Sequence, residues 1–227
     1  MMKRRMYHGA GLLSILAVSL VIPTVVRAQF SANFQTNTIS GVTSNWGGTF
    51  YIVGSNTFLD TLQIINGGVL SDSACVIGYV PGGSNNTVLV SGLGSMLTNF
   101  FDVYLGNDGG NNRLVVTNRG AVYSGNGYLG FSLFGTNNTA LISDTGSVWR
   151  VKTNLCIGYI DGANHLIVSN GAVASDVIGM IGSNANLNTA LITGPGSMWS
   201  NTVTLLTGYI GSKNQLVVTN GGLAWSR

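Results

Sequence analysis

The sequence repeats itself with a period of about 26 residues, and this periodicity limits the fold more than any other feature. A short apolar segment closed by Asn, Asp or Gly begins at residues 62, 88, 114, 140, 166, 190 and 216. Successive starts are 26, 26, 26, 26, 24 and 26 residues apart, and alternate segments resemble each other most, which gives a paired unit of about 52 residues. Such a period indicates stacked units, because one unit alone cannot bury its apolar face.

Two sets of residues recur once per unit and mark its corners. The residue that closes the apolar segment is always one that accepts a left-handed backbone: Asn66, Gly92, Asn118, Asp144, Asn170, Gly194 and Asn220. The second set consists of glycines that follow an apolar residue or Thr: Gly54, Gly78, Gly106, Gly130, Gly158, Gly182 and Gly208. Gly adopts positive φ freely and Asn or Asp tolerates it, so we expect tight corners at both places.

The composition agrees with short strands joined by such corners. The chain has 33 Gly, no Glu, only 7% charged residues and 45% hydrophobic residues, and many of the apolar residues are β-branched, as strands prefer. We predict an all-β protein, a right-handed parallel β-helix of about seven ~26-residue coils. The predicted solenoid spans residues 46–227, after an N-terminal lead-in or cap at 29–45. A β-propeller is the alternative, but its blades recur every ~40–50 residues and have no 26-residue sub-period.

The first 28 residues have the pattern of a signal peptide. Lys3, Arg4 and Arg5 precede an apolar stretch at residues 12–26, and Ala28 precedes the predicted cleavage site. An uncleaved anchor is the alternative, but about 15 residues fall short of the ~20 that span a bilayer. We therefore expect export, with no membrane span in the mature chain.

Removal of the leader changes the charge balance. The whole chain has ten basic and seven acidic residues, and four of the basic ones lie in residues 1–28. The mature chain then carries six basic residues against seven Asp, a net charge of about −1. This balance argues against nucleic acid as a partner.

Further motifs recur in the same order within the units. They are Asn86-Thr87, Asn138-Thr139 and Asn188-Thr189, followed by Gly146-Ser147-Val148-Trp149 and Gly196-Ser197-Met198-Trp199. Over roughly residues 46–227 this order resembles the repeat of autotransporter (type V secretion) passengers and PEP-CTERM surface proteins. The resemblance implies a passenger-type structural or adhesive surface. Leu97 departs from it by standing where Trp is expected, and the chain stops within a unit, so we expect a fragment of a longer passenger.

The sequence offers little for catalysis or for metal binding. Its seven acids, Asp60, Asp72, Asp102, Asp108, Asp144, Asp161 and Asp176, share no phase in the repeat, so we expect no carboxylate pair across a cleft. Asp108 and Asp161 come closest, two coils apart, and are interpreted as turn residues, with a weak cation site as the alternative. His165 is the one histidine of the mature chain and is expected to be exposed at a strand end. We predict no catalytic residue, cofactor or metal.

The two cysteines are predicted to be unpaired. Cys75 and Cys156 are 81 residues apart, or about three coils, which corresponds to ~14 Å along the stack. A disulfide needs Cα atoms within ~7 Å. Their offsets from the repeat glycines also differ by one residue, so the side chains should point to opposite faces.

Recurrent aromatic residues leave two interpretations open. Trp149 and Trp199 recur two coils apart, and another set follows the repeat glycines: Tyr79, Phe131, Tyr159 and Tyr209. The favoured interpretation is that they stabilise the coils by stacking. The alternative is a sugar-binding aromatic row on one face.

These observations lead to a functional expectation. We predict an exported structural or adhesive solenoid at the cell surface, associated with the outer membrane or extracellular. The expected partners are a surface glycan, or a host or neighbouring cell surface, and another copy of the chain at the open C-terminal coil. The alternatives are a non-catalytic carbohydrate-binding surface and a polysaccharide-degrading β-helix enzyme.

Overall fold

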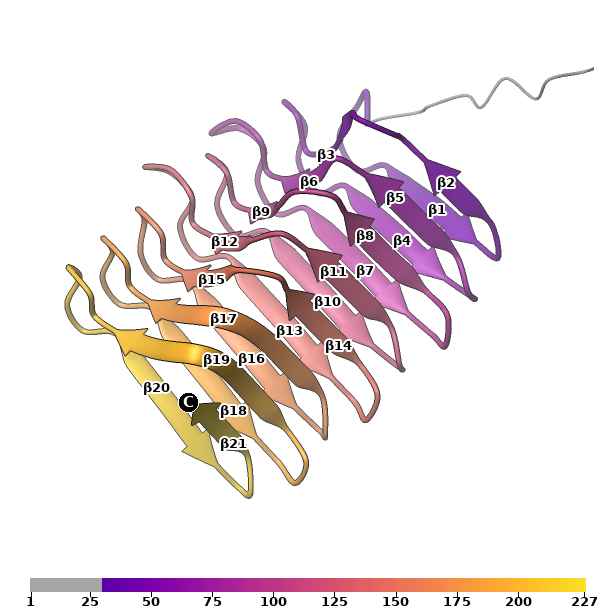
Figure 1. The fold of residues 1–227 in the computed structure, drawn as a ribbon. Coiled ribbons are helices and arrows are strands. Elements are labelled where there is room, and N and C mark those ends of the chain that lie inside the picture. Colours follow the sequence, from indigo (N-terminus) through magenta and orange to yellow (C-terminus); the bar gives the residue numbers. More distant parts are fainter. Residues whose placement is uncertain (1–29) are drawn as a thin grey trace, which may run out of the picture.

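The protein is a parallel β-solenoid of about seven turns, in which each turn lies directly on the one before (Figure 1). The computed structural model describes residues 30–227. The predicted signal peptide at 1–28 lies outside the described residues. Every regular element in the described part is a strand, and every strand pairing is parallel. The predicted fold class is therefore confirmed.

One face of the solenoid is an eight-stranded sheet built from one strand of each coil. Its strands are β1 (Thr36–Ser40), β4 (Thr61–Ile65), β7 (Thr87–Ser91), β10 (Arg113–Thr117), β13 (Thr139–Ser143), β16 (His165–Ser169), β18 (Thr189–Thr193) and β20 (Gln215–Thr219). Leu114 pairs with Val88 on one side and with Ala140 on the other, so partners are one sequence period apart.

The remaining strands form a second, bent sheet. The strands before the bend are β2 (Thr43–Asn45), β5 (Val69–Asp72), β8 (Met96–Asn99), β11 (Ala121–Ser124), β14 (Val148–Val151) and β21 (Leu223–Ser226). After the bend come β3 (Phe50–Val53), β6 (Ala74–Ile77), β9 (Val103–Leu105), β12 (Gly127–Leu129) and β15 (Asn154–Ile157). Two long strands run through the bend and join both parts, β17 (Val173–Ile181) and β19 (Met198–Thr207).

The parallel stack begins earlier than the boundary at residue 46 that the sequence predicts. β1 pairs with β4 in register, and β2 pairs with β5. The segment expected as a lead-in or cap therefore contributes the first strands of both sheets. No helix within residues 30–227 is long and apolar enough to cross a bilayer.

The left-handed corners appear where the substitution pattern predicts them. Asn118, Asp144 and Asn170 have φ of 51°, 75° and 53°. The repeat glycines also have positive φ, for example 75° at Gly106. These corners turn the chain from one sheet to the next within very few residues.

A column of one aspartate and six asparagine side chains runs along the solenoid, between the bent sheet and the eight-stranded sheet, and all but the last of them are buried. Its members are Asp60, Asn86, Asn112, Asn138, Asn164, Asn188 and Asn214. The backbone N–H of each member donates to the side-chain Oδ1 of the next, at 2.8–3.0 Å. We call this column the asparagine ladder; it satisfies backbone groups that face away from water.

The ladder explains why glycine recurs at the repeat landmarks. A Cβ on Gly54, Gly78, Gly106, Gly130, Gly158 or Gly182 would overlap with the amide of the ladder residue in the next coil. These positions therefore need glycine for space as well as for positive φ.

The 52-residue pairing of units has its own physical basis in the core. Trp149, Ala174 and Trp199 occupy one inward column in successive coils, and all are fully buried. Each indole fills the space beside a glycine of the preceding coil. A Cβ on Gly127 would lie 2.6 Å from Trp149, and one on Gly179 would lie 2.8 Å from Trp199. From Trp149 onward, large and small side chains therefore alternate between coils, whereas Leu70, Leu97 and Val122 fill the same column in the earlier coils.

Candidate binding pocket

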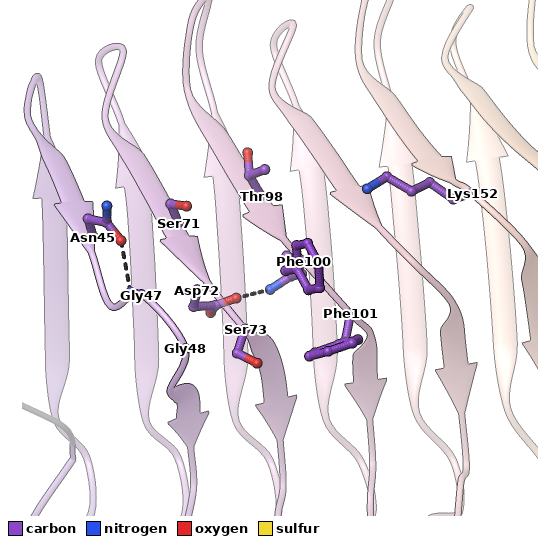
Figure 2. Close-up of a pocket in the computed structure, with 11 residues that line it drawn as sticks. Asn45, Gly47, Gly48, Ser71, Asp72, Ser73, Thr98, Phe100, Phe101 and Lys152 are labelled. Atoms are coloured by element: carbon purple, nitrogen blue, oxygen red, sulfur yellow. Dashed lines mark hydrogen bonds between the residues drawn. The ribbon is translucent and has the colours of Figure 1, made fainter.

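A pocket of about 560 Å³ opens at the N-terminal end of the bent sheet, where β5 and β8 approach the bend. Figure 2 shows its lining, which comes from coils that are far apart in the sequence. The lining residues are Asn45, Gly47, Gly48, Ser71, Asp72, Ser73, Thr98, Asn99, Phe100, Phe101 and Lys152.

One wall is a row of short polar side chains on neighbouring strands. Asn45 pairs with Ser71 in the β2–β5 register, and Ser71 pairs with Thr98 in the β5–β8 register. These three residues alternate with the inward-facing residues of their strands and so point outward. The same outward column continues through Tyr123 to Arg150. The wall thus presents an amide and two hydroxyl groups at the spacing of adjacent strands, ~4.8 Å.

The second wall is an exposed aromatic pair. Phe100 and Phe101 are 72% and 55% exposed, and their rings meet edge to face with centroids 4.7 Å apart. Their backbone is fixed nonetheless, because the N–H of Phe100 donates to the Asp72 carbonyl at 3.0 Å and that of Phe101 to the Ser73 carbonyl at 2.8 Å. Two large apolar rings at this corner of the coil are therefore fixed in place and exposed to solvent.

Lys152 supplies an exposed positive charge to this pocket. Its backbone N–H donates to the Ser124 carbonyl at 2.9 Å, which fixes the base of the side chain on the stack. Figure 2 shows the side chain extended toward Phe100 and Thr98.

The floor contains a buried acid with an incomplete set of hydrogen bonds. Asp72 is 3% exposed and accepts a hydrogen bond from the Asn99 amide, while its Oδ2 has no partner in the described structure. Burial raises the pKa of Asp72 from 3.8 to about 7, and the bond from Asn99 partly offsets that rise.

Asp176 occupies the equivalent position four coils later, where the following coil carries the tryptophan of the repeat. It is also 3% exposed, but both of its oxygens are paired, with the Trp199 indole N–H and with the Asn201 amide, each at 2.6 Å. Leu97 stands at the equivalent of Trp199 in the coil after Asp72. The departure from the repeat at Leu97 therefore removes the indole donor that Asp72 would otherwise have.

The expectation that no aspartates share a phase is wrong for one pair. Asp72 and Asp176 lie 104 residues apart, four periods of 26, and occupy the same inward column. Four coils separate them by ~19 Å. The carboxyl pair of a glycosidase is ~5–9.5 Å apart, so these two do not form one.

The other acids lie at separate places. Asp60 belongs to the asparagine ladder, and Asp102 accepts hydrogen bonds from the Tyr104 hydroxyl at 3.0 Å and from Asn126 at 2.8 Å. Asp144 occupies a corner, where hydrogen bonds from the Thr117 hydroxyl and then from the Asn118 N–H lower the pKa of its carboxyl. The Oδ1 of Asp161 accepts from the N–H of Gly162 at 2.7 Å, as in a turn. Asp108 lies 53 residues before Asp161 in the sequence, in the loop after β9.

The histidine and the two cysteines of the described chain do not line the pocket. His165 is the first residue of β16 and is half-buried rather than exposed, and burial lowers its pKa. Both cysteines are free, as predicted. Cys75 pairs with the inward-facing Val103, whereas Cys156 pairs with Tyr128 in the outward column, so they face opposite ways. Among residues 30–227 no three His, Cys, Asp or Glu side chains come together as a metal site.

The recurrent aromatic residues divide into core and surface. Trp149 and Trp199 are fully buried and cannot join a row on the surface, and Ala174 keeps them from stacking on each other. Phe131 and Tyr159 stack with centroids 5.2 Å apart and an interplanar angle of 8°. Tyr79 and Tyr209 are exposed.

The residues that form the pocket were missed in the sequence. Phe100 and Phe101 form the one Phe-Phe pair in the chain, and Leu97 nearby breaks the repeat, so a local signal was present. Nothing in the sequence linked them to Lys152, which reaches the pocket only through the stacking of coils.

The chain matches no protein-family model, and no curated protein or solved structure shows significant similarity to it.

Proposed function

We propose that the protein is an exported structural or adhesive solenoid at a cell surface, of the passenger type that its repeat resembles. The observation that supports this most is the unbroken stack, in which the same two sheets continue through every coil of the described chain. Function in such a protein resides in the faces that the stack displays along its length.

The interior makes this stack stiff. Apolar columns such as Leu62, Val88 and Leu114 are fully buried, and the asparagine ladder links each coil to the next. Each coil bonds to its neighbours through both sheets, so bending would break hydrogen bonds in the interior, where they are costly to lose.

Expression of the full chain in a Gram-negative host tests the main proposal. We expect the exported protein to begin at Gln29 by mass spectrometry, and beads coated with it to adhere to cells more than albumin-coated beads do. Protein that stays in the cytoplasm with residues 1–28 attached, together with beads that adhere no better than the albumin control, would overturn it.

A further inference from the structure

We propose that the pocket lined by Phe100, Phe101 and Lys152 binds an acidic polysaccharide, that is, a chain of sugars that carry carboxylate groups. This inference goes beyond the structural role and does not rest on it. It stands on three features of the pocket: an aromatic wall, a polar wall and an exposed cation.

The aromatic wall offers ring faces that the fold itself leaves unused. Four other aromatic side chains cover one another: Tyr104 and Tyr128 in β9 and β12 stack with ring centroids 5.4 Å apart, and Phe131 and Tyr159 in the loops after β12 and β15 stack at 5.2 Å. Phe100 and Phe101 contact each other only edge to face and remain more than half exposed. Two large rings held against water on a rigid corner mark a binding surface, and the negative face of such a ring attracts the polarised C–H groups of a sugar.

The polar wall fits hydroxyl groups of a ligand that has repeating units. Asn45, Ser71 and Thr98 lie side by side on three successive strands, so their side chains recur at the strand spacing of ~4.8 Å. Ser and Thr hydroxyls both donate and accept, and an Asn amide does the same, which suits the hydroxyl groups of sugars. The Oδ1 of Asn45 already accepts from the Gly47 N–H at 2.8 Å, and its Nδ2 remains to donate. A small apolar ligand would leave the Ser71 and Thr98 hydroxyls and this amide N–H without partners.

The charge of the surface selects an acidic chain over a neutral one. Lys152 is exposed, and Arg150 stands exposed in the outward column that continues from Thr98 and Tyr123. The one acid in the lining, Asp72, is buried and bonded to Asn99, so a ligand that lies on the surface meets the cations first. Carboxylates pair with such exposed cations through charge-assisted hydrogen bonds.

The position of the cations also sets the direction of the bound chain. Asn45 comes from the first coil, whereas Arg150 and Lys152 come from the β14 coil and the segment just after it. A ligand that touches both ends of the pocket must therefore run across the strands, along the axis of the solenoid (Figure 2).

Binding of sodium polygalacturonate to the purified full chain tests this proposal, with dextran as the uncharged probe. Isothermal titration calorimetry should show binding of polygalacturonate and much weaker binding of dextran. Lys152→Gln and the double variant Phe100→Ala/Phe101→Ala should each weaken polygalacturonate binding by about tenfold or more. Lys213→Gln and Phe134→Ala are the matched controls, because both side chains are exposed and lie away from the pocket.

The outcomes separate the proposal from its rivals. Absence of polygalacturonate binding, equal binding of dextran, or equal losses in Lys152→Gln and Lys213→Gln would each overturn it. Circular dichroism of every variant shows whether a loss of binding reflects loss of the fold. The bead assay for adhesion is a separate readout, so either proposal can fail while the other holds.

Discussion

Asn138 lies in the middle of the asparagine ladder, and its replacement by Ala tests how much that ladder stabilises the solenoid. The side chain is fully buried. Its Oδ1 accepts from the backbone N–H of Asn112 at 2.8 Å, and its Nδ2 donates to the Gly135 carbonyl at 2.7 Å and to Asn164 Oδ1 at 3.1 Å. The change Asn138→Ala removes all three bonds while leaving the backbone of the coil in place.

The expected loss follows from the groups left behind. The Asn112 N–H loses its acceptor and the Gly135 carbonyl loses this donor, and each buried polar group left unsatisfied costs about 1–3 kcal/mol. Asn164 Oδ1 keeps a bond from the backbone N–H of residue 138. We therefore expect Asn138→Ala to lower the free energy of unfolding by about 2–6 kcal/mol.

Urea denaturation followed by circular dichroism and by tryptophan fluorescence measures this loss. Trp149 and Trp199 are buried and report on the same half of the stack. Asn137→Gly is the control: Asn137 is exposed, and its φ of 56° suits glycine, so this change should cost less than about 1 kcal/mol. A loss below 1 kcal/mol for Asn138→Ala, or one no larger than the control, would refute the role assigned to the ladder.

Three further changes probe the same interior, each measured by urea denaturation. Asp60→Asn should raise the free energy of unfolding by about 1–2 kcal/mol, because its buried Oδ2 has no hydrogen-bond partner among residues 30–227 and an amide could donate to the ladder; a destabilised variant would contradict this. Gly127→Ala should lower the free energy of unfolding, because the new Cβ would lie 2.6 Å from Trp149. The same change should cost less in a Trp149→Leu background, and an equal cost in both backgrounds would exclude the clash. Burial raises the pKa of Asp72 to about 7 and that of Asp176 to about 6, both above the usual 3.8, so folding takes up protons. Stability should therefore fall as pH rises from 4 to 8, by about 4 kcal/mol from Asp72 alone, and Asp72→Asn should flatten the curve; an unchanged slope in that variant would contradict the assignment.

The repeat could be predicted from the sequence because it rests on local chemistry. Corners need positive φ, and the residues that accept it at low cost are few, so Asn118, Asp144 and Gly194 identify the same corner in different coils. The strands between corners alternate inward and outward residues, which fixes the faces. From the period and these faces, the separation of Cys75 and Cys156 followed, and the free thiols agree with it.

The asparagine ladder could not be predicted in the same way. Asn86 and Asn138 stand before strands in a sequence context typical of turns, where Asn is normally exposed. Whether such a side chain points into the stack depends on the neighbouring coil, because only the backbone N–H of that coil completes the bond. Their spacing of 26 residues was visible, but burial was not.

The hydrogen bonding of the two aspartates in one inward column could not be predicted from the sequence either. Asp72 and Asp176 share a column, yet one carboxylate has its indole donor and the other does not, because Leu97 replaces the tryptophan. The sequence shows the substitution, but its consequence depends on which coil lies above the acid.

The sequence by itself determined the period, the corners and the alternation of faces, since these depend on residues within one coil. Tertiary structure alone decided the interior ladder, the pairing of Trp149 with Gly127, and the pocket that joins Phe100 to Lys152. Each of these is a contact between different coils. The stacking of one coil on the next decides which side chains become neighbours, and the residues of a single repeat do not determine that geometry.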